Sequence, residues 1–143
     1  MAGEDCLLCD AAAADAFFER KRVWEDDLWR LSVVLRGAVP GFSHLESKRH
    51  IAFITDLDGA EASSLGGVLA RSTRLLRKAT DADKVYVYVF GDRVPHFHVN
   101  LAPHVDGDAL VGGRGLLAAG TPDVATTSHL ATARAVAAAF RNA

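Results

Sequence analysis

Residues 96–104 read His-Phe-His-Val-Asn-Leu-Ala-Pro-His, and this is the most informative stretch of the chain. Polar and apolar residues alternate along it, which predicts a β-strand, because successive side chains of a strand point to opposite faces. His96, His98 and Asn100 would then share one face, and the apolar residues between them would enter a core. Packing explains such a polar row poorly. The row indicates either a functional site or the solvated face of an edge strand.

The strand pattern extends to both sides of this stretch. Before it, Lys84–Phe90 alternates valine with aromatic residues, and Gly91-Asp92-Arg93 predicts a turn into a returning strand over Pro95–Pro103. Further strands are predicted at Arg22–Glu25, Leu28–Leu35 and Ser43–Lys48, the first two joined by a turn at Asp26-Asp27. These strands can form one antiparallel sheet.

Three helices are predicted around these strands. A short helix over Ala11–Phe18 follows the N-cap residue Asp10. A long helix begins after Asp58, where Asp58 and Glu61 have capping-box spacing, and its apolar period continues to Ala79. Within it, Gly66-Gly67 indicates either close packing on the sheet or a weak point. The last helix is predicted to open at Thr121-Pro122-Asp123, after a glycine-rich loop over 105–120. One sheet with segregated helices is the α+β class.

Composition bounds the class of protein. The chain has 143 residues, 50% hydrophobic and 24% charged, which predicts a single globular domain over 1–143 with its core at about 6–104 and a C-terminal helix over 121–143. A net charge of −2 argues against a nucleic-acid partner. No apolar run approaches the ~20 residues of a membrane span. The acidic N-terminus does not resemble an export signal, so we expect a cytoplasmic protein with Cys6 and Cys9 reduced.

The pattern His96-x-His98-x-Asn100 resembles the signature strand of the histidine triad (HIT) superfamily. Pro40-Gly41 and Lys48-Arg49-His50 resemble the Pro-Gly-His and Pro-Lys-Arg-His segments of that family, in the same order. Cys6-Leu7-Leu8-Cys9 resembles the N-terminus of its zinc-containing bacterial members. The resemblance implies an antiparallel sheet with helices packed on it, and a homodimer.

The resemblance also implies a chemistry. Members attack the α-phosphorus of a nucleotide with the middle histidine, here His98, and form a covalent nucleotidyl-histidine. The expected activity is that of a nucleotide hydrolase or nucleotidyl transferase on a nucleoside phosphate, such as a dinucleoside polyphosphate. Asn100 stands where the family usually has a third histidine; its amide can donate to a phosphate oxygen but cannot protonate a leaving group. The alternatives are a nucleotide-binding module with little or no catalysis, and a zinc-stabilised dimerisation scaffold.

Four residues form the predicted metal site. Cys6 and Cys9 supply the compact half of a tetrahedral zinc set, but two such cysteines by themselves are more often buried small hydrophobes. The resemblance adds His50 and His96, which occupy the zinc-binding positions of the metal-containing HIT branches. The zinc implied there is structural.

Other positions depart from the family pattern. Phe42 stands where many members have His, and His104 stands where many have Arg, whose charge His104 could partly replace. We interpret Arg93 as a solvated turn residue rather than a ligand contact. Ser43 and His44 lie near the expected nucleotide pocket, and neither is assigned a role.

Overall fold

A five-stranded antiparallel sheet forms the centre of the computed structural model, which describes residues 5–108, 110–111, 116–117 and 121–143. The strand order is β1-β2-β3-β5-β4. The strands are β1 (Arg20–Glu25), β2 (Trp29–Val34), β3 (Ser43–Ser47), β4 (Lys84–Tyr88) and β5 (His98–His104). Each pair is antiparallel, which confirms the predicted sheet and the α+β class.

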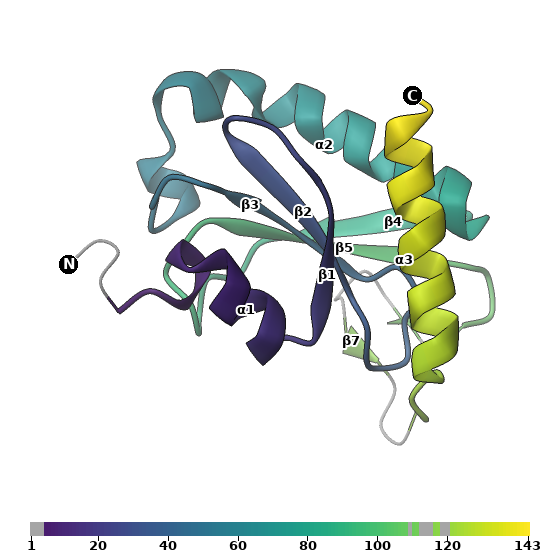
Figure 1. Cartoon of the computed structure of the whole chain (residues 1–143). Helices are drawn as coiled ribbons and strands as arrows, with labels where there is room; N and C mark the ends of the chain where they lie inside the picture. Colours follow the sequence, from purple (N-terminus) through teal and green to yellow (C-terminus); the bar gives the residue numbers. More distant parts are fainter. Residues whose placement is uncertain (1–4, 109, 112–115, 118–120) are drawn as a thin grey trace.

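The helices cover the two faces of this sheet unequally (Figure 1). The long helix α2 (Gly59–Thr80) and the C-terminal helix α3 (Thr126–Arg141) pack on one face and against each other. The short helix α1 (Ala11–Phe17) lies by β1 on the other side, after the 3-10 turn η1 (Leu7–Cys9). A second 3-10 turn, η2 (Ile54–Asp56), precedes α2. Among the described residues, no helix is long and apolar enough to cross a bilayer.

The face toward α2 and α3 is largely apolar because alternate residues of β2 and β5, and Leu45 of β3, are apolar. Leu31, Leu45 and Val99 lie in register on β2, β3 and β5, and all three are fully buried. Leu76 of α2 and Val136 of α3 pack against the same cluster. The alternate positions of the three strands point to the opposite face, where most of the residues are polar.

Several expectations about element boundaries are wrong, among them the start of β1, which begins at Arg20 rather than Arg22. β5 begins at His98 rather than Pro95, so His96 precedes the strand. β4 ends at Tyr88, two residues early. The last helix begins at Thr126, with Ala125 as its N-cap, because the preceding segment is held extended: the Val124 amide donates to the Gly37 carbonyl at 2.9 Å.

The start of α2 also differs from its prediction. Asp58 occupies the N-cap position, but within the described part of the chain its side chain makes no capping hydrogen bond. Both Asp58 and Glu61 instead bind the Arg49 guanidinium, at 2.7 and 3.0 Å. A methyl group added at Gly66 or Gly67 would meet no described atom within 4 Å, so close packing does not explain these glycines.

The predicted loop over 105–120 is only partly described. It contains two short paired strands, β6 (Leu110–Val111) and β7 (Leu116–Leu117), which the sequence pattern did not indicate. Residues 109, 112–115 and 118–120 of this loop lie outside the described part of the chain, as do residues 1–4.

Candidate functional site

The four predicted metal ligands come together at one end of the sheet. The Sγ atom of Cys6 lies 3.3 Å from Nδ1 of His96, and Sγ of Cys9 lies 3.3 Å from Nδ1 of His50 and 3.5 Å from Nδ1 of His96. All four donor atoms lie within 4.8 Å of one another. In a tetrahedral zinc site, ordinary Zn–S and Zn–N bonds separate sulfur from nitrogen by about 3.5 Å. The cluster therefore has the donor set and the spacing to hold a metal ion.

His96 is oriented for this role by the backbone. Its imidazole is fully buried, and Nε2–H donates to the Ser47 carbonyl at 2.6 Å, which leaves the lone pair of Nδ1 directed at the cysteines. Burial lowers the pKa of His96 and keeps the ring neutral. Burial, and then a hydrogen bond that the Cys9 thiol donates to Cys6, raise the pKa of Cys9 to about 11, so a metal must displace a proton there.

The cysteine turn is tied to the sheet by a buried charge. The Arg30 guanidinium donates to the Leu8 carbonyl of η1 at 2.8 Å and to Glu46 at 3.0 Å. On the opposite side, the Phe97 amide donates to the Ile51 carbonyl at 2.6 Å, which holds the segment after β3 beside the start of β5. Together, these contacts hold the cysteine turn, the segment after β3 and the start of β5 close to one another.

His98 has a different environment from His96, so the expectation that both lie on one strand face is wrong. His98 is the first residue of β5 and lines a cavity of about 370 Å³. Its Nδ1 lies 2.7 Å from the His96 carbonyl. A carbonyl oxygen only accepts, so Nδ1 carries the proton and Nε2 of the neutral ring keeps its lone pair.

Asn100 lies beside His98 in the same cavity. Its Nδ2 donates to the Tyr88 carbonyl at 3.4 Å, so one N–H bond of the amide is directed toward the edge strand β4. The second N–H bond and the amide oxygen remain for other partners. The cavity is lined by Leu8, Phe18, His44, Phe90, Gly91, Asp92, Arg93, Val94, His98 and Asn100.

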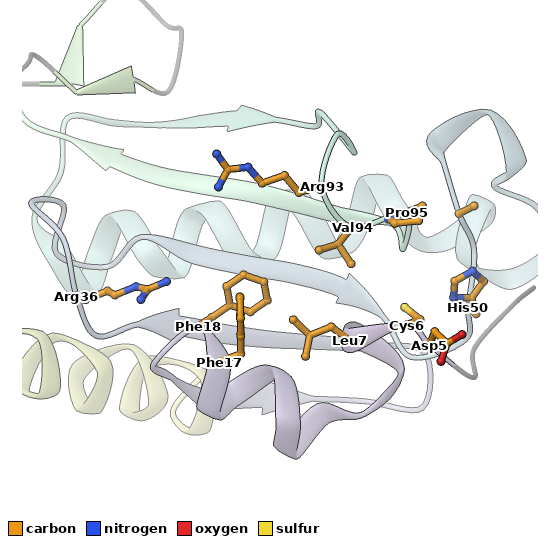
Figure 2. Close-up of a pocket in the computed structure, with 11 residues that line it drawn as sticks. Asp5, Cys6, Leu7, Phe17, Phe18, Arg36, His50, Arg93, Val94 and Pro95 are labelled. Carbon is orange, nitrogen blue, oxygen red and sulfur yellow. The ribbon is translucent and has the colours of Figure 1, made fainter.

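A larger cavity of about 930 Å³ adjoins the first and shares Phe18, Arg93 and Val94 with it. Figure 2 shows Arg36 at one end of this cavity and Cys6 and His50 at the other. Arg93 is exposed, as a solvated turn residue should be, and it also lines both cavities. One guanidinium group, that of Arg93, therefore borders the cavity beside His98, where the Asp92 carboxylate also lies, and Arg36 lies in the adjoining cavity.

A buried polar network beneath the smaller cavity was not predicted. Glu46 is fully buried between two guanidinium groups, with Arg20 at 2.5 Å and Arg30 at 3.0 Å. Arg20 also donates to Nδ1 of His44 at 3.1 Å. Burial, and then the charge of Arg20, lowers the pKa of His44 to about 3. The alternation Ser43-His44-Leu45-Glu46-Ser47 was a signal for this network, because it places His44 and Glu46 on one strand face.

The remaining departures from the family pattern have local explanations. Phe42 packs edge-on against the His44 ring at 5.5 Å between centroids. Ser43 is buried and its hydroxyl donates to the Gly41 carbonyl. His104 lies at the far end of β5, bonded to Asp108 at 2.8 Å and, among the described residues, outside the lining of both cavities.

No protein-family model matches the chain, and no curated protein matches its sequence. Solved structures do match it. A Hit-like protein involved in cell-cycle regulation from Bartonella henselae is 19% identical over 97% of this chain and 99% of that one, with a TM-score of 0.73. A hypothetical histidine triad nucleotide-binding protein from Sulfolobus tokodaii is 16% identical, over 96% and 93% of the two chains, with a TM-score of 0.73.

A zinc-bound histidine triad family protein from Mycobacterium smegmatis is also similar, at 20% identity over 99% of both chains and a TM-score of 0.71. Identities at this level show shared architecture rather than shared activity. The agreement in fold extends over nearly the whole length of each protein. The chain therefore has the fold of the histidine triad proteins, as residues 96–104 predict.

Proposed function

We propose that the protein is a nucleotide hydrolase or nucleotidyl transferase that uses His98 as its nucleophile. The observation that carries the proposal is the hydrogen bond from Nδ1 of His98 to the His96 carbonyl, which leaves an unprotonated Nε2 beside a cavity bordered by arginine. A neutral imidazole nitrogen with a fixed tautomer is a competent nucleophile toward phosphorus. The substrate class is a nucleoside phosphate or a dinucleoside polyphosphate.

The reaction has two steps in this proposal. The Nε2 lone pair of His98 forms a bond to the α-phosphorus, while the bond from phosphorus to the leaving group breaks and the leaving group departs with the electron pair. Water or another acceptor then attacks the same phosphorus and releases its proton to solvent, while the P–N bond electrons return to His98. Asn100 donates its second N–H bond to a phosphate oxygen. The leaving group takes its proton from solvent, because the Asn100 amide can donate a hydrogen bond but cannot transfer a proton.

The metal of the Cys6, Cys9, His50 and His96 cluster is zinc in this proposal, and its role is structural. Four protein ligands close a tetrahedral zinc site and leave no position for substrate. The zinc-bound histidine triad protein of the same fold supports the choice of metal. A bound zinc would stabilise η1 and the start of β5, immediately before His98.

The test is incubation with a panel of nucleoside phosphates followed by intact-protein mass spectrometry. Wild type is expected to form a nucleotidyl adduct that is labile in acid and stable in base. His98→Ala should abolish both adduct and turnover while it retains nucleotide binding. His104→Ala is the matched control on the same strand and should keep the wild-type rate, since His104 lies away from the cavity. Equal rates for wild type and His98→Ala would refute the nucleophile.

Asn100 supports a second candidate, a nucleotide-binding module with weak or no catalysis. The two candidates differ in turnover rather than in binding. Calorimetric titration with each nucleotide of the panel measures binding directly. Binding without adduct or turnover by wild type would establish the module, and Asn100→His then tests whether the usual family residue restores catalysis.

The proposal includes a homodimer in the cytoplasm, where Cys6 and Cys9 stay reduced. The edge strand β4 exposes 47% of Val87, and the exposed Phe90 follows it. A two-fold pairing through β4 and α2 would bury these apolar groups. Light scattering at micromolar concentration should give twice the 15.3 kDa monomer mass, and a monomer mass would contradict the dimer.

A further inference from the structure

His44 is a buried histidine that the proposed mechanism does not yet use. It lies on β3 directly across from Asn100 of β5, and its ring centroid is 6.0 Å from that of His98 at an interplanar angle of 68°. Only 9% of its surface is exposed, and that part belongs to the cavity beside His98. Phe18 and Phe42 pack edge-on against its ring and hold it in place.

The tautomer of His44 follows from its partner. A guanidinium only donates, so Nδ1 of His44 accepts from Arg20 and the ring proton lies on Nε2. Arg20 cannot turn away, because its other bonds join it to Asp15 at 2.8 Å and to Glu46. The low pKa of His44 keeps it neutral across the physiological range.

The Nε2–H group of His44 has no hydrogen-bond partner among the residues that the structure describes. The Nε2 atom is not fully buried but opens on the cavity beside His98, where an oxygen of a ligand can accept from it. The neighbouring donor, Asn100, already directs one of its two N–H bonds to Tyr88. His44 is therefore an unengaged donor, held rigid next to the nucleophile.

We infer that His44 is a catalytic residue that donates Nε2–H to a non-bridging oxygen of the phosphoryl group attacked by His98. This inference rests on the proposed function. The two rings line the same cavity with centroids 6.0 Å apart, so a phosphoryl group bonded to His98 would lie beside His44, where a hydrogen bond of about 2.9 Å can form. A rigid donor stabilises the charge that develops on that oxygen without reorganisation, and the Arg20 cation polarises the donor further.

The kinetic test compares two substitutions. His44→Leu removes the donor, and we expect kcat to fall on the order of 10²-fold with little change in KM, since the bond strengthens in the transition state. His44→Gln keeps an amide donor and should recover part of the rate. Ser32→Ala is the matched control: Ser32 pairs with His44 on β2, its hydroxyl has no partner within the described residues, and its loss should leave both constants unchanged.

Two kinetic outcomes would overturn the inference. A raised KM with unchanged kcat would show that His44 binds the base or ribose uniformly in ground and transition state. Unchanged kcat and KM in folded His44→Leu would show that His44 only accepts from Arg20. If the wild-type protein turns over no nucleotide of the panel, the proposed function is refuted. If turnover depends on His98 but is the same in His44→Leu, only the inference about His44 is refuted.

A spectroscopic test needs no change at His44. In 15N-labelled His98→Ala protein, the His44 resonances should report a neutral ring protonated at Nε2. Adding a nucleoside monophosphate should move the Nε2–H proton resonance downfield, and the matching nucleoside without phosphate should not. A shift with both ligands, or with neither, would contradict a phosphate contact.

Discussion

The two faces of the central sheet are built from the same three strands, but one is stabilised by apolar burial and the other contains paired buried charges. Toward α2 and α3, the row Leu31, Leu45 and Val99 is stabilised by apolar burial, which depends on area and tolerates swaps of similar volume. One residue along each strand, the row Arg30, Glu46 and His98 faces the other side. Buried charges there are tolerable only while every partner is present. The first face makes the fold stable, and the second makes it chemically specific.

The largest expected effect belongs to neither face but to the metal cluster at one end of the sheet. Cys9→Ser should lower the unfolding free energy by several kcal/mol, because the binding energy of a structural zinc is folding energy. Urea unfolding with elemental analysis measures it, and a chelator should reproduce the effect in wild type. Metal-free protein purified without chelators, together with unchanged melting of Cys9→Ser, would refute the site.

Removal of one buried charge tests the pairing rule next. Glu46→Gln leaves Arg20 and Arg30 buried without their shared carboxylate, and we expect a loss of about 3–5 kcal/mol in unfolding free energy. Glu25→Gln is the matched control, since its bond to Lys48 is at the surface and should contribute under about 1 kcal/mol. Equal losses for the two variants would mean that burial does not distinguish these ion pairs.

The apolar face should respond in stability alone. Leu45→Ala, one residue from Glu46, creates a core cavity and should cost about 2–5 kcal/mol. The kcat of this variant should equal that of wild type at a temperature where both are folded, because the Leu45 side chain points away from the cavity beside His98. Denaturant unfolding and a turnover assay on the same preparation measure both quantities. A large fall in kcat would show that the two faces are coupled.

The smallest expected effect is a slope in pH. The pKa of His44 is about 3 in the folded protein, against 6.5 in the unfolded chain, so between these values only the unfolded chain binds the proton. Stability should therefore fall by about 1.4 kcal/mol per pH unit as pH decreases through this window, beyond other groups. His44→Gln should lack this part of the slope. Parallel unfolding curves at about pH 6 and pH 5 compare the variants, and identical slopes would contradict the buried neutral ring.

Much of the fold and of the candidate site could be predicted because it depends on local period. Alternation along residues 96–104 and 84–90 predicts strands, and the apolar spacing after Asp58 predicts α2. Spacing and resemblance together identify the Cys6, Cys9, His50 and His96 cluster, whose donor atoms do meet. Each of these predictions depends on residues close in sequence, whose relative positions follow from the helix and strand geometry common to all proteins.

What only the tertiary structure decided is the choice of partner across long separations in sequence. The period of β3 places His44 and Glu46 on one face, but it does not say that Arg20, 24 and 26 residues away, would bind both. In the same way, the capping-box spacing is real, yet Arg49 takes both carboxylates, and Gly37 holds the segment before α3 extended. These contacts depend on the register between strands and on which distant segments pack side by side. Local sequence determines which groups a face presents, whereas packing determines which of them are satisfied and which remain free for a ligand.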